Sequence, residues 1–191
     1  MNRFGQGSPC PFVFYKKELP MSSGPILHPI PPVYDNLSRI LILGSFPSVR
    51  SREEGFFYGH PRNRFWTVLA RLLEEPLPVS AEEKRAFLLR NRIALWDVIR
   101  SCTISGSSDS SIRDVVPNDL SCILSAADIR EIFVNGRTAE KLYQTWIEPE
   151  TGRPCTLLPS TSPANASWGL ERLTESWSAV LPALRGTGKH S

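Results

Sequence analysis

The residues with the clearest chemical potential lie in a polar and aromatic stretch that runs from Gly44-Ser-Phe-Pro-Ser48 to Trp66. Within this stretch, Asn63 carries an amide that both donates and accepts hydrogen bonds, so its side chain can hold a water molecule. Asn is also a preferred cap at the start of a helix, and Tyr58 and Phe65 suit a packed core. From residue types alone, the structural interpretation of this stretch is favoured over the catalytic one.

A second candidate segment, Leu158–Ala166, combines prolines that stiffen the backbone with small side chains and hydroxyls. Its backbone N–H groups, together with Ser160, Thr161 and Ser162, can bind phosphate without a formal charge. The alternative is a rigid connection between a strand and a helix, with a polar residue such as Asn165 as the helix cap. Residue types alone leave these two interpretations even.

A third candidate is Asp97, which directly follows the apolar run Ile93–Trp96. A carboxylate there can accept a hydrogen bond from an imide-type N–H of a base. The alternative is a helix N-cap, for which Asp is a preferred residue. Beyond it, Ser105–Ser111 is rich in serine and glycine, and we expect a flexible loop.

The cysteines and histidines give no support to a metal site. The four cysteines lie far apart without a CxxC pair, and the chain has three histidines. We therefore expect no metal, no iron–sulfur cluster and no other cofactor. No apolar run is long enough to span a bilayer, and the first residues do not resemble a secretory signal, so we expect a cytoplasmic protein. The net charge of +3 allows contact with a polyanion but does not demand it.

Strand and helix patterns alternate along the chain. The expected strands cover residues 39–44, 93–96, 129–134 and 155–158, and the expected helices cover 62–75, 81–91, 137–147 and 170–184. This alternation predicts an α/β fold, a three-layer αβα sandwich around a four-stranded, mostly parallel sheet. In such sheets, ligands bind beyond the carboxyl ends of the strands. All three candidate segments follow an expected strand, so we expect them to meet at that edge.

Proline usage suggests how the chain is divided. Seven of the 17 prolines lie within the first 35 residues, a density that disfavours both helix and central strand. We expect a flexible extension over residues 1–27, a single domain over 28–185 and a flexible tail over 186–191.

Two long motifs, LGSFPSVRSREEGFFYGHPRNRFW and LPSTSPANA, together make the sequence more specific. In this order they resemble the hypoxanthine-DNA (DNA-deoxyinosine) glycosylases, family 6 of the uracil-DNA glycosylase superfamily, over roughly residues 28–184. The resemblance implies a uracil-DNA glycosylase-like fold and hydrolysis of the N-glycosidic bond of deoxyinosine in DNA, as part of base excision repair.

The resemblance also implies roles for particular residues. The first motif of the superfamily commonly has an acidic or amide residue where this chain has Phe46, so Phe46 would wall the base pocket and Asn63 would position the catalytic water. The histidine of the second motif is absent, since that position falls at Leu158 or Pro159, which argues against fast uracil chemistry. The expected base-binding residues are Gly44, Ser45, Phe46, Tyr58 and Asp97. The expected DNA-binding residues are Pro47, Ser48, Ser160, Thr161, Ser162, Pro163, Ala164 and Asn165, and the arginine candidates for phosphate contact are Arg50, Arg52, Arg62 and Arg64.

The expected partner is DNA that contains deaminated bases, bound by a monomer. No lysine lies in either motif, which argues against lyase chemistry through a Schiff base and for a monofunctional enzyme. Three alternatives stay open: a uracil or mismatch glycosylase, a non-catalytic αβα module that binds nucleic acid, and a hydrolase of free nucleosides.

Overall fold

A parallel four-stranded sheet forms the centre of the molecule. The computed structural model of the chain describes residues 24–104 and 112–185. The central strands are β2 (Ile40–Gly44), β3 (Ile93–Asp97), β6 (Glu131–Asn135) and β7 (Cys155–Leu158), in the order β3-β2-β6-β7, and each neighbouring pair is parallel. Every residue of β2 and β3 is buried. Continuous apolar strands of this kind must be covered on both faces.

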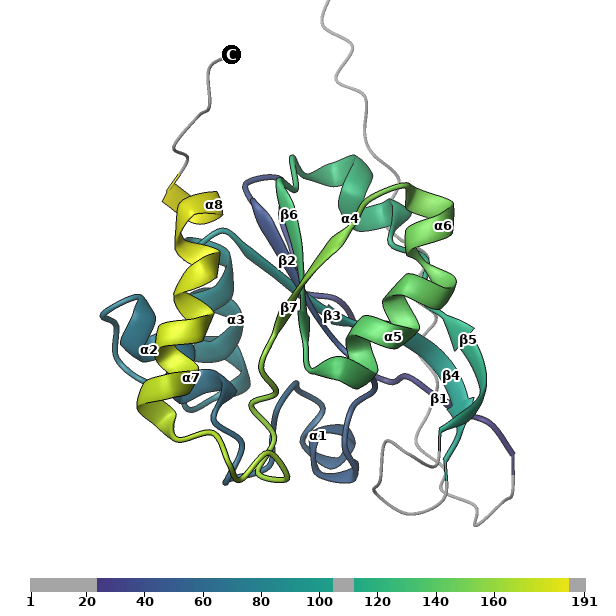
Figure 1. Cartoon of the computed structure of the whole chain (residues 1–191), viewed down its shortest axis with the longest axis horizontal. Coiled ribbons are helices and arrows are strands. Elements are labelled where there is room, and N and C mark those ends of the chain that lie inside the picture. Colours follow the sequence, from purple (N-terminus) through teal and green to yellow (C-terminus); the bar gives the residue numbers. More distant parts are fainter. Residues whose placement is uncertain (1–23, 105–111, 186–191) are drawn as a thin grey trace, which may run out of the picture.

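Helices cover both faces of this sheet (Figure 1). One layer holds α2 (Phe65–Leu72), α3 (Ala81–Arg90), α7 (Leu170–Trp177) and α8 (Leu181–Arg185), and the other holds α4 (Ser121–Ala126), α5 (Arg137–Trp146) and α6 (Glu148–Thr151). The predicted three-layer αβα sandwich is therefore confirmed. No helix in the described ranges is both long and apolar enough to cross a membrane.

A second, antiparallel sheet was not predicted. It contains β1 (Ile26–Leu27), β4 (Ile99–Thr103) and β5 (Arg113–Pro117), in the order β1-β4-β5. Ile26 pairs with Cys102, so β1 overlaps the end of the extension predicted over residues 1–27. The predicted flexible loop over 105–111 lies outside the described residues.

The predicted helices differ from the observed ones mainly at their ends. Helix α3 begins at a capping box in which Ser80 and Glu83 bond each other's backbone, as their spacing predicts. The single closing helix predicted over 170–184 is interrupted, because a 3₁₀ turn, Ser178–Val180, separates α7 from α8. Pro182 has no N–H to donate to the carbonyl four residues earlier, which explains the interruption.

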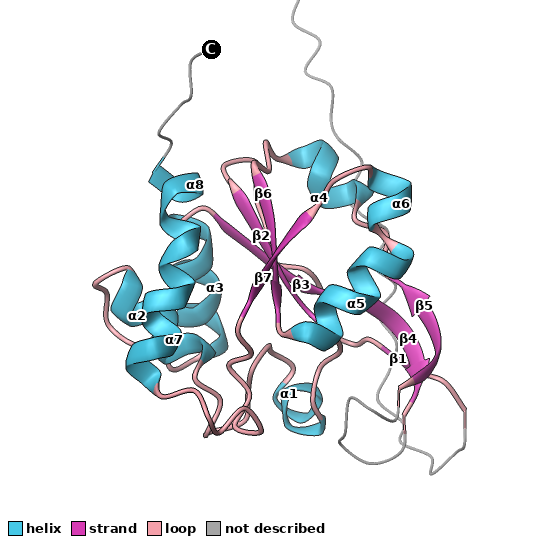
Figure 2. Ribbon diagram, in the orientation of Figure 1, coloured by secondary structure: helices cyan, strands magenta, loops and turns pink. Residues whose placement is uncertain are grey.

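The carboxyl ends of the four parallel strands point to the same edge of the molecule. Helix α1 (Val49–Glu54) and the loops that follow β2 and β7 lie at this edge (Figure 2). The two motifs singled out in the sequence are therefore adjacent in space, although more than 90 residues separate Asn63 from Ser160 in the chain.

Candidate active site

A cavity of about 350 Å³ opens at the carboxyl ends of the parallel strands. Both motifs line it, and so do the residues that end β3 and β6. The predicted site residues on its wall are Gly44, Ser45, Phe46, Pro47, Ser48, Tyr58, Asn63, Asp97, Ser160, Thr161, Ser162 and Ala164. Pro163 and Asn165 belong to the same loop as Ser160 but are not among the lining residues. Three further residues line the cavity without having been assigned a role from the sequence, namely Ser51, Phe57 and Asn135.

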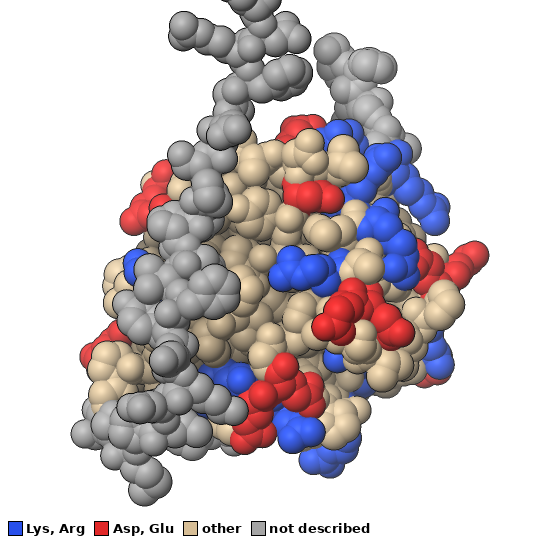
Figure 3. Space-filling model, turned by 180° about the vertical axis from the view of Figure 1, so that it is seen from behind, with Lys and Arg blue, Asp and Glu red and all other residues tan. Residues whose placement is uncertain are grey.

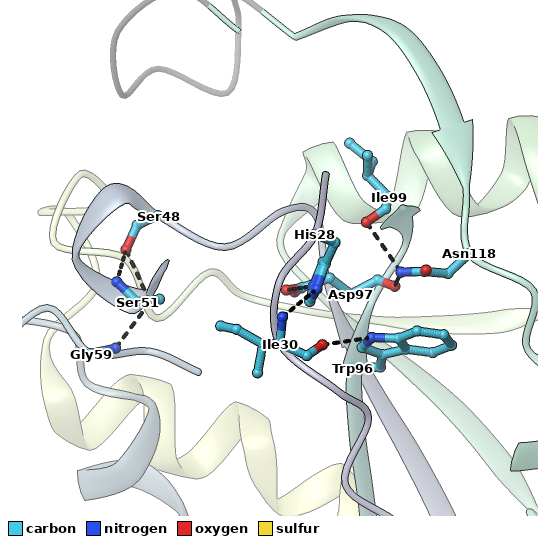
Figure 4. A network of polar contacts seen from close by, with 9 residues as sticks. All are labelled: His28, Ile30, Ser48, Ser51, Gly59, Trp96, Asp97, Ile99 and Asn118. Carbon is cyan, nitrogen blue, oxygen red and sulfur yellow. Dashed lines mark hydrogen bonds and ion pairs between the residues drawn. The ribbon is translucent and has the colours of Figure 1, made fainter. Parts of the chain in front are cut away.

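Short polar contacts hold the first motif in a compact loop. The Ser48 side chain caps α1 by accepting the Ser51 N–H, and the two hydroxyl oxygens are 3.0 Å apart. Ser51 Oγ also accepts the Gly59 N–H at 3.1 Å (Figure 4). These bonds tie the beginning of the loop to its end, and the segments around Ser48 and Asn63 line the same cavity.

Asn63 lies just before α2, whose N-cap is Arg64 and not Asn63. Its Oδ1 accepts the Phe65 N–H at 3.0 Å, a local turn contact at the start of the helix. Because only the oxygen of the amide can accept this N–H, the bond assigns the positions of Oδ1 and Nδ2. Within residues 24–104 and 112–185, Asn63 Nδ2 has no hydrogen-bond partner, and the side chain lines the cavity. The geometry therefore permits the predicted water-binding role, which stays a prediction. Phe65 and the neighbouring Trp66 are buried core residues.

Arg64 has a different role from the phosphate contact expected of it. Its guanidinium donates to the backbone carbonyls of Ser162 at 2.7 Å and Asn165 at 3.0 Å, and also to that of Trp168. A planar guanidinium suits such a fork of acceptors. Arg64 therefore fastens the second motif to the residue next to Asn63.

Asn135 secures the same loop from the end of β6. Its Oδ1 accepts the Thr161 N–H at 3.0 Å, and its Nδ2 donates to Thr161 Oγ1 at 2.9 Å. Thr161 is fully buried and Asn135 binds its hydroxyl, so this arrangement disfavours the predicted contact of that hydroxyl with DNA phosphate. Ser160 and Ser162, which are partly exposed, remain the hydroxyl candidates for that contact.

Asp97 lies on the cavity wall at the end of β3. The chain continues from it through Val98 into β4, so the alternative that Asp97 caps a helix is wrong. Its side chain is almost fully buried, and Oδ2 lies 2.8 Å from Nε2 of His28. Asn118 donates to the Asp97 carbonyl, which fixes the backbone as well. Among the described residues that line the cavity, Asp97 alone carries a carboxylate and none carries a basic side chain.

Two aromatic residues shape the cavity. Tyr58 has φ of +54°, a region that is costly for a side chain of this size, and it stacks on Phe65 at 3.9 Å between ring centroids. Strain of this kind persists only where the surroundings hold the residue in place. Phe46 packs edge-on against His28, and the Arg52 guanidinium lies 5.7 Å from the Phe46 ring centroid.

Exposed charges of opposite sign lie near one another on α1 and on one face of the molecule. Arg50 forms ion pairs with Glu53 and Glu54 on α1. On the face opposite to that of Figure 1, acidic and basic side chains lie close together (Figure 3). In the described part of the chain, no three histidine, cysteine or acidic side chains are grouped as metal ligands would be.

Comparison with known proteins identifies relatives over most of the chain. The family model described as the uracil DNA glycosylase superfamily matches residues 31–185. A hypoxanthine DNA glycosylase of Methanosarcina acetivorans is 39% identical over 153 residues, which cover 79% of this chain and 95% of that protein. A protein of the same description from Methanosarcina barkeri is 34% identical over 137 residues, which cover 71% of this chain and 85% of the relative.

A solved structure has the same fold. It is the solution NMR structure of a Methanosarcina acetivorans protein provisionally assigned as a uracil DNA glycosylase. The two structures superpose with a TM-score of 0.70 at 37% sequence identity, over 82% of this chain and 96% of the other.

Proposed function

The chain belongs to the uracil DNA glycosylase superfamily, and we propose that it is a monofunctional DNA glycosylase that removes hypoxanthine from deoxyinosine in DNA. The observation that carries this proposal is the cavity at the strand ends, where the amide of Asn63 and the carboxylate of Asp97 line one chamber. The two relatives named hypoxanthine DNA glycosylase support the choice of base.

Asp97 supplies selectivity through hydrogen-bond polarity. Hypoxanthine has a donor at N1 and an acceptor at O6, whereas adenine has an acceptor at N1. A carboxylate at the cavity wall accepts from the N1–H of hypoxanthine and faces a lone pair in adenine. Guanine, xanthine and uracil also present an N–H beside a carbonyl, so Asp97 does not by itself separate these bases. A poorly paired base costs less free energy to flip out of the duplex, and this difference contributes further selectivity for the damaged base.

Asn63 positions the water in the hydrolytic step. The bond between C1′ and N9 breaks through a sugar with oxocarbenium character, the water oxygen bonds to C1′, and a water proton is transferred to the departing base. Oδ1 of Asn63 has a second lone pair besides the one that accepts the Phe65 N–H, so it can orient the water. Hydrogen-bond donors around the base stabilise the negative charge that it gains as it departs.

The rim of the cavity suits the DNA backbone. Ser48, Ser160 and Ser162 offer hydroxyls that bind phosphate without adding positive charge. Ala164 is exposed on the second motif and fills part of the space left by the flipped nucleotide. We propose that the enzyme acts as a monomer.

A panel of substrates tests the proposal. End-labelled duplexes carry deoxyinosine, deoxyuridine or no lesion, and alkali cuts the strand wherever a base has been removed. We expect cleavage at deoxyinosine, little at deoxyuridine and none in the undamaged duplex. Cleavage mainly at deoxyuridine would support the uracil glycosylase alternative, and binding without cleavage would support the non-catalytic module. Release of hypoxanthine from free inosine at a similar rate would indicate a nucleoside hydrolase.

A further inference from the structure

His28 reaches the site from a segment that lies outside the match to the superfamily, which begins at residue 31. Backbone hydrogen bonds fix this segment at His28 and again at Val33. The His28 N–H donates to the Arg100 carbonyl at 2.7 Å, and Val33 forms a pair of backbone hydrogen bonds with Leu95. The segment therefore joins both sheets, and it places the His28 ring directly behind Asp97.

The hydrogen bonds around the ring assign its tautomer. The Ile30 N–H donates to His28 Nδ1 at 3.2 Å, so Nδ1 carries a lone pair and the proton lies on Nε2. Nε2–H then donates to Asp97 Oδ2 at 2.8 Å (Figure 4). The rings of Phe46, Phe57 and Trp96 surround the imidazole, with centroids 5.8, 6.1 and 6.3 Å away. This packing leaves the ring little freedom to turn.

The other oxygen of the carboxylate has a different environment. A Cβ added to Gly44 would collide with Asp97 Oδ1 and would lie 3.0 Å from the Tyr58 hydroxyl. Oδ1 therefore lies against Gly44, beside Tyr58, and all three residues line the cavity. His28 itself is not among the lining residues, and its side chain is 2% exposed.

We propose that His28 is a positioning residue for base recognition. Its Nε2–H fixes Oδ2 of Asp97, so that Oδ1 is presented to the cavity as the acceptor for a ring N–H of the base. This inference rests on the proposed glycosylase function. It adds a requirement that the function alone does not make, namely a donor at the position of His28 Nε2.

Two amide substitutions at position 28 separate positioning from packing. In His28→Gln, the side-chain nitrogen reaches the place of Nε2 and can donate to Asp97. In His28→Asn, the amide ends near the place of Nδ1 and is too short to reach the carboxylate. Under single-turnover conditions on a deoxyinosine duplex, we expect Asn to lower the rate by about 10- to 100-fold, as loss of an orienting partner does, and Gln to stay within about threefold. Thermal unfolding checks that each variant is folded. If His28→Asn is unfolded, His28→Phe is used in its place, because it keeps an aromatic ring but has no hydrogen-bond donor.

A double-mutant cycle then tests whether His28 acts through Asp97. We measure His28→Asn, Asp97→Ala and the double variant, both for excision and for binding to a duplex with 2′-fluoro-deoxyinosine, which resists hydrolysis. If His28 works only by orienting the carboxylate, its substitution changes either quantity less than about twofold once the carboxylate is gone. A merely structural role gives the same fold-loss in both backgrounds.

The outcomes distinguish this inference from the function on which it rests. Rescue by Gln together with non-additive losses supports the positioning role. Equal losses for Gln and Asn, or losses that multiply, overturn it while leaving a deoxyinosine glycosylase in place. A wild-type protein that cleaves none of the tested lesions overturns the proposed function, and the inference with it.

Discussion

Gly44 has no space for a side chain, because Asp97 Oδ1 lies 2.2 Å from the position that a Cβ would take. We expect Gly44→Ala to displace Asp97 and to lower the excision rate about 100-fold or more, since small misplacements at a reacting site are costly. The matched control is Gly169→Ala, where the nearest atom to an added Cβ is 3.9 Å away. Single-turnover kinetics of both variants check this. Wild-type activity in Gly44→Ala would show that the contact with Asp97 does not matter.

The Cys155 thiol is expected to react slowly in the folded protein. Burial, with the negative charges of Glu148 and Glu140 nearby, raises the pKa of Cys155 from 9.0 to about 11. At pH 8 the reactive thiolate is then roughly 100-fold scarcer than for an unperturbed thiol, and it grows as the pH approaches 11. Alkylation by iodoacetamide, followed by peptide mass spectrometry, measures the rate in the folded chain and in guanidinium. Equal rates in the two states would contradict the shift.

Sequence alone predicts the site residues unevenly. Phe46 and Asn63 belong to a long motif that follows a predicted buried strand. Their position at the carboxyl edge of the sheet, on the cavity wall, is therefore predictable from the sequence. His28 gives no such signal, because it lies among prolines and reaches Asp97 only through the pairing of distant strands. Thr161 has the residue type for a phosphate contact, but Asn135 binds both its amide and its hydroxyl inside the protein.

At the scale of elements, Arg64 determines how the second motif sits beside α2. We expect Arg64→Lys to lower the excision rate about 10- to 100-fold, because an ammonium cannot reach several carbonyls in one plane. Arg85→Lys is the control, since Arg85 is exposed on α3 and does not line the cavity. The measurement is single-turnover excision of deoxyinosine. Equal rates for the two lysine variants would mean that the second motif keeps its position without the hydrogen bonds from the Arg64 guanidinium.

The capping box of α3 contributes to stability and not to activity. Ser80→Ala is expected to lower the free energy of unfolding by about 1 kcal/mol at pH 7, with an unchanged excision rate. The backbone N–H groups of Val79 and Ser80 lower the pKa of Glu83. The contribution of the ionised Glu83 is therefore present above its unfolded pKa and is lost as the pH falls through the folded one. Denaturant unfolding of Ser80→Ala and Glu83→Gln at pH 7 and pH 3 tests this, and a Gln effect that persists at pH 3 would contradict it.

Elements with strong local patterns are predictable, and those that depend on distant partners are not. Strand β2 is an uninterrupted apolar run, and α3 carries its own capping signal. Strands β4 and β5 have mixed, partly exposed residues, and they depend on their pairing with each other and, for β4, with β1. The six-residue helix α1 is too short for periodicity to identify it.

At the scale of the whole molecule, the parallel sheet creates the site. Because β2, β3, β6 and β7 all run in one direction, the segments that follow them converge on one edge, as the α/β pattern predicts. The net charge of +3 predicts only a modest electrostatic contribution to DNA binding. Under the proposed function, recognition then depends mainly on the fit of the flipped base in the cavity.

The most direct test of this account is single-turnover excision of hypoxanthine from a deoxyinosine duplex by wild type and two variants of Asn63. Asn63→Ala removes the amide and its bond to the Phe65 N–H, whereas Asn63→Ser keeps an oxygen that can accept this N–H. Asn91→Ala is the control, because Asn91 binds Glu75 at the opposite end of the strands. We predict that both Asn63 variants lose about 100-fold or more in rate and that the control stays close to wild type. Excision at the wild-type rate by Asn63→Ser would show that Asn63 only holds the start of α2 in place, and would contradict its catalytic role.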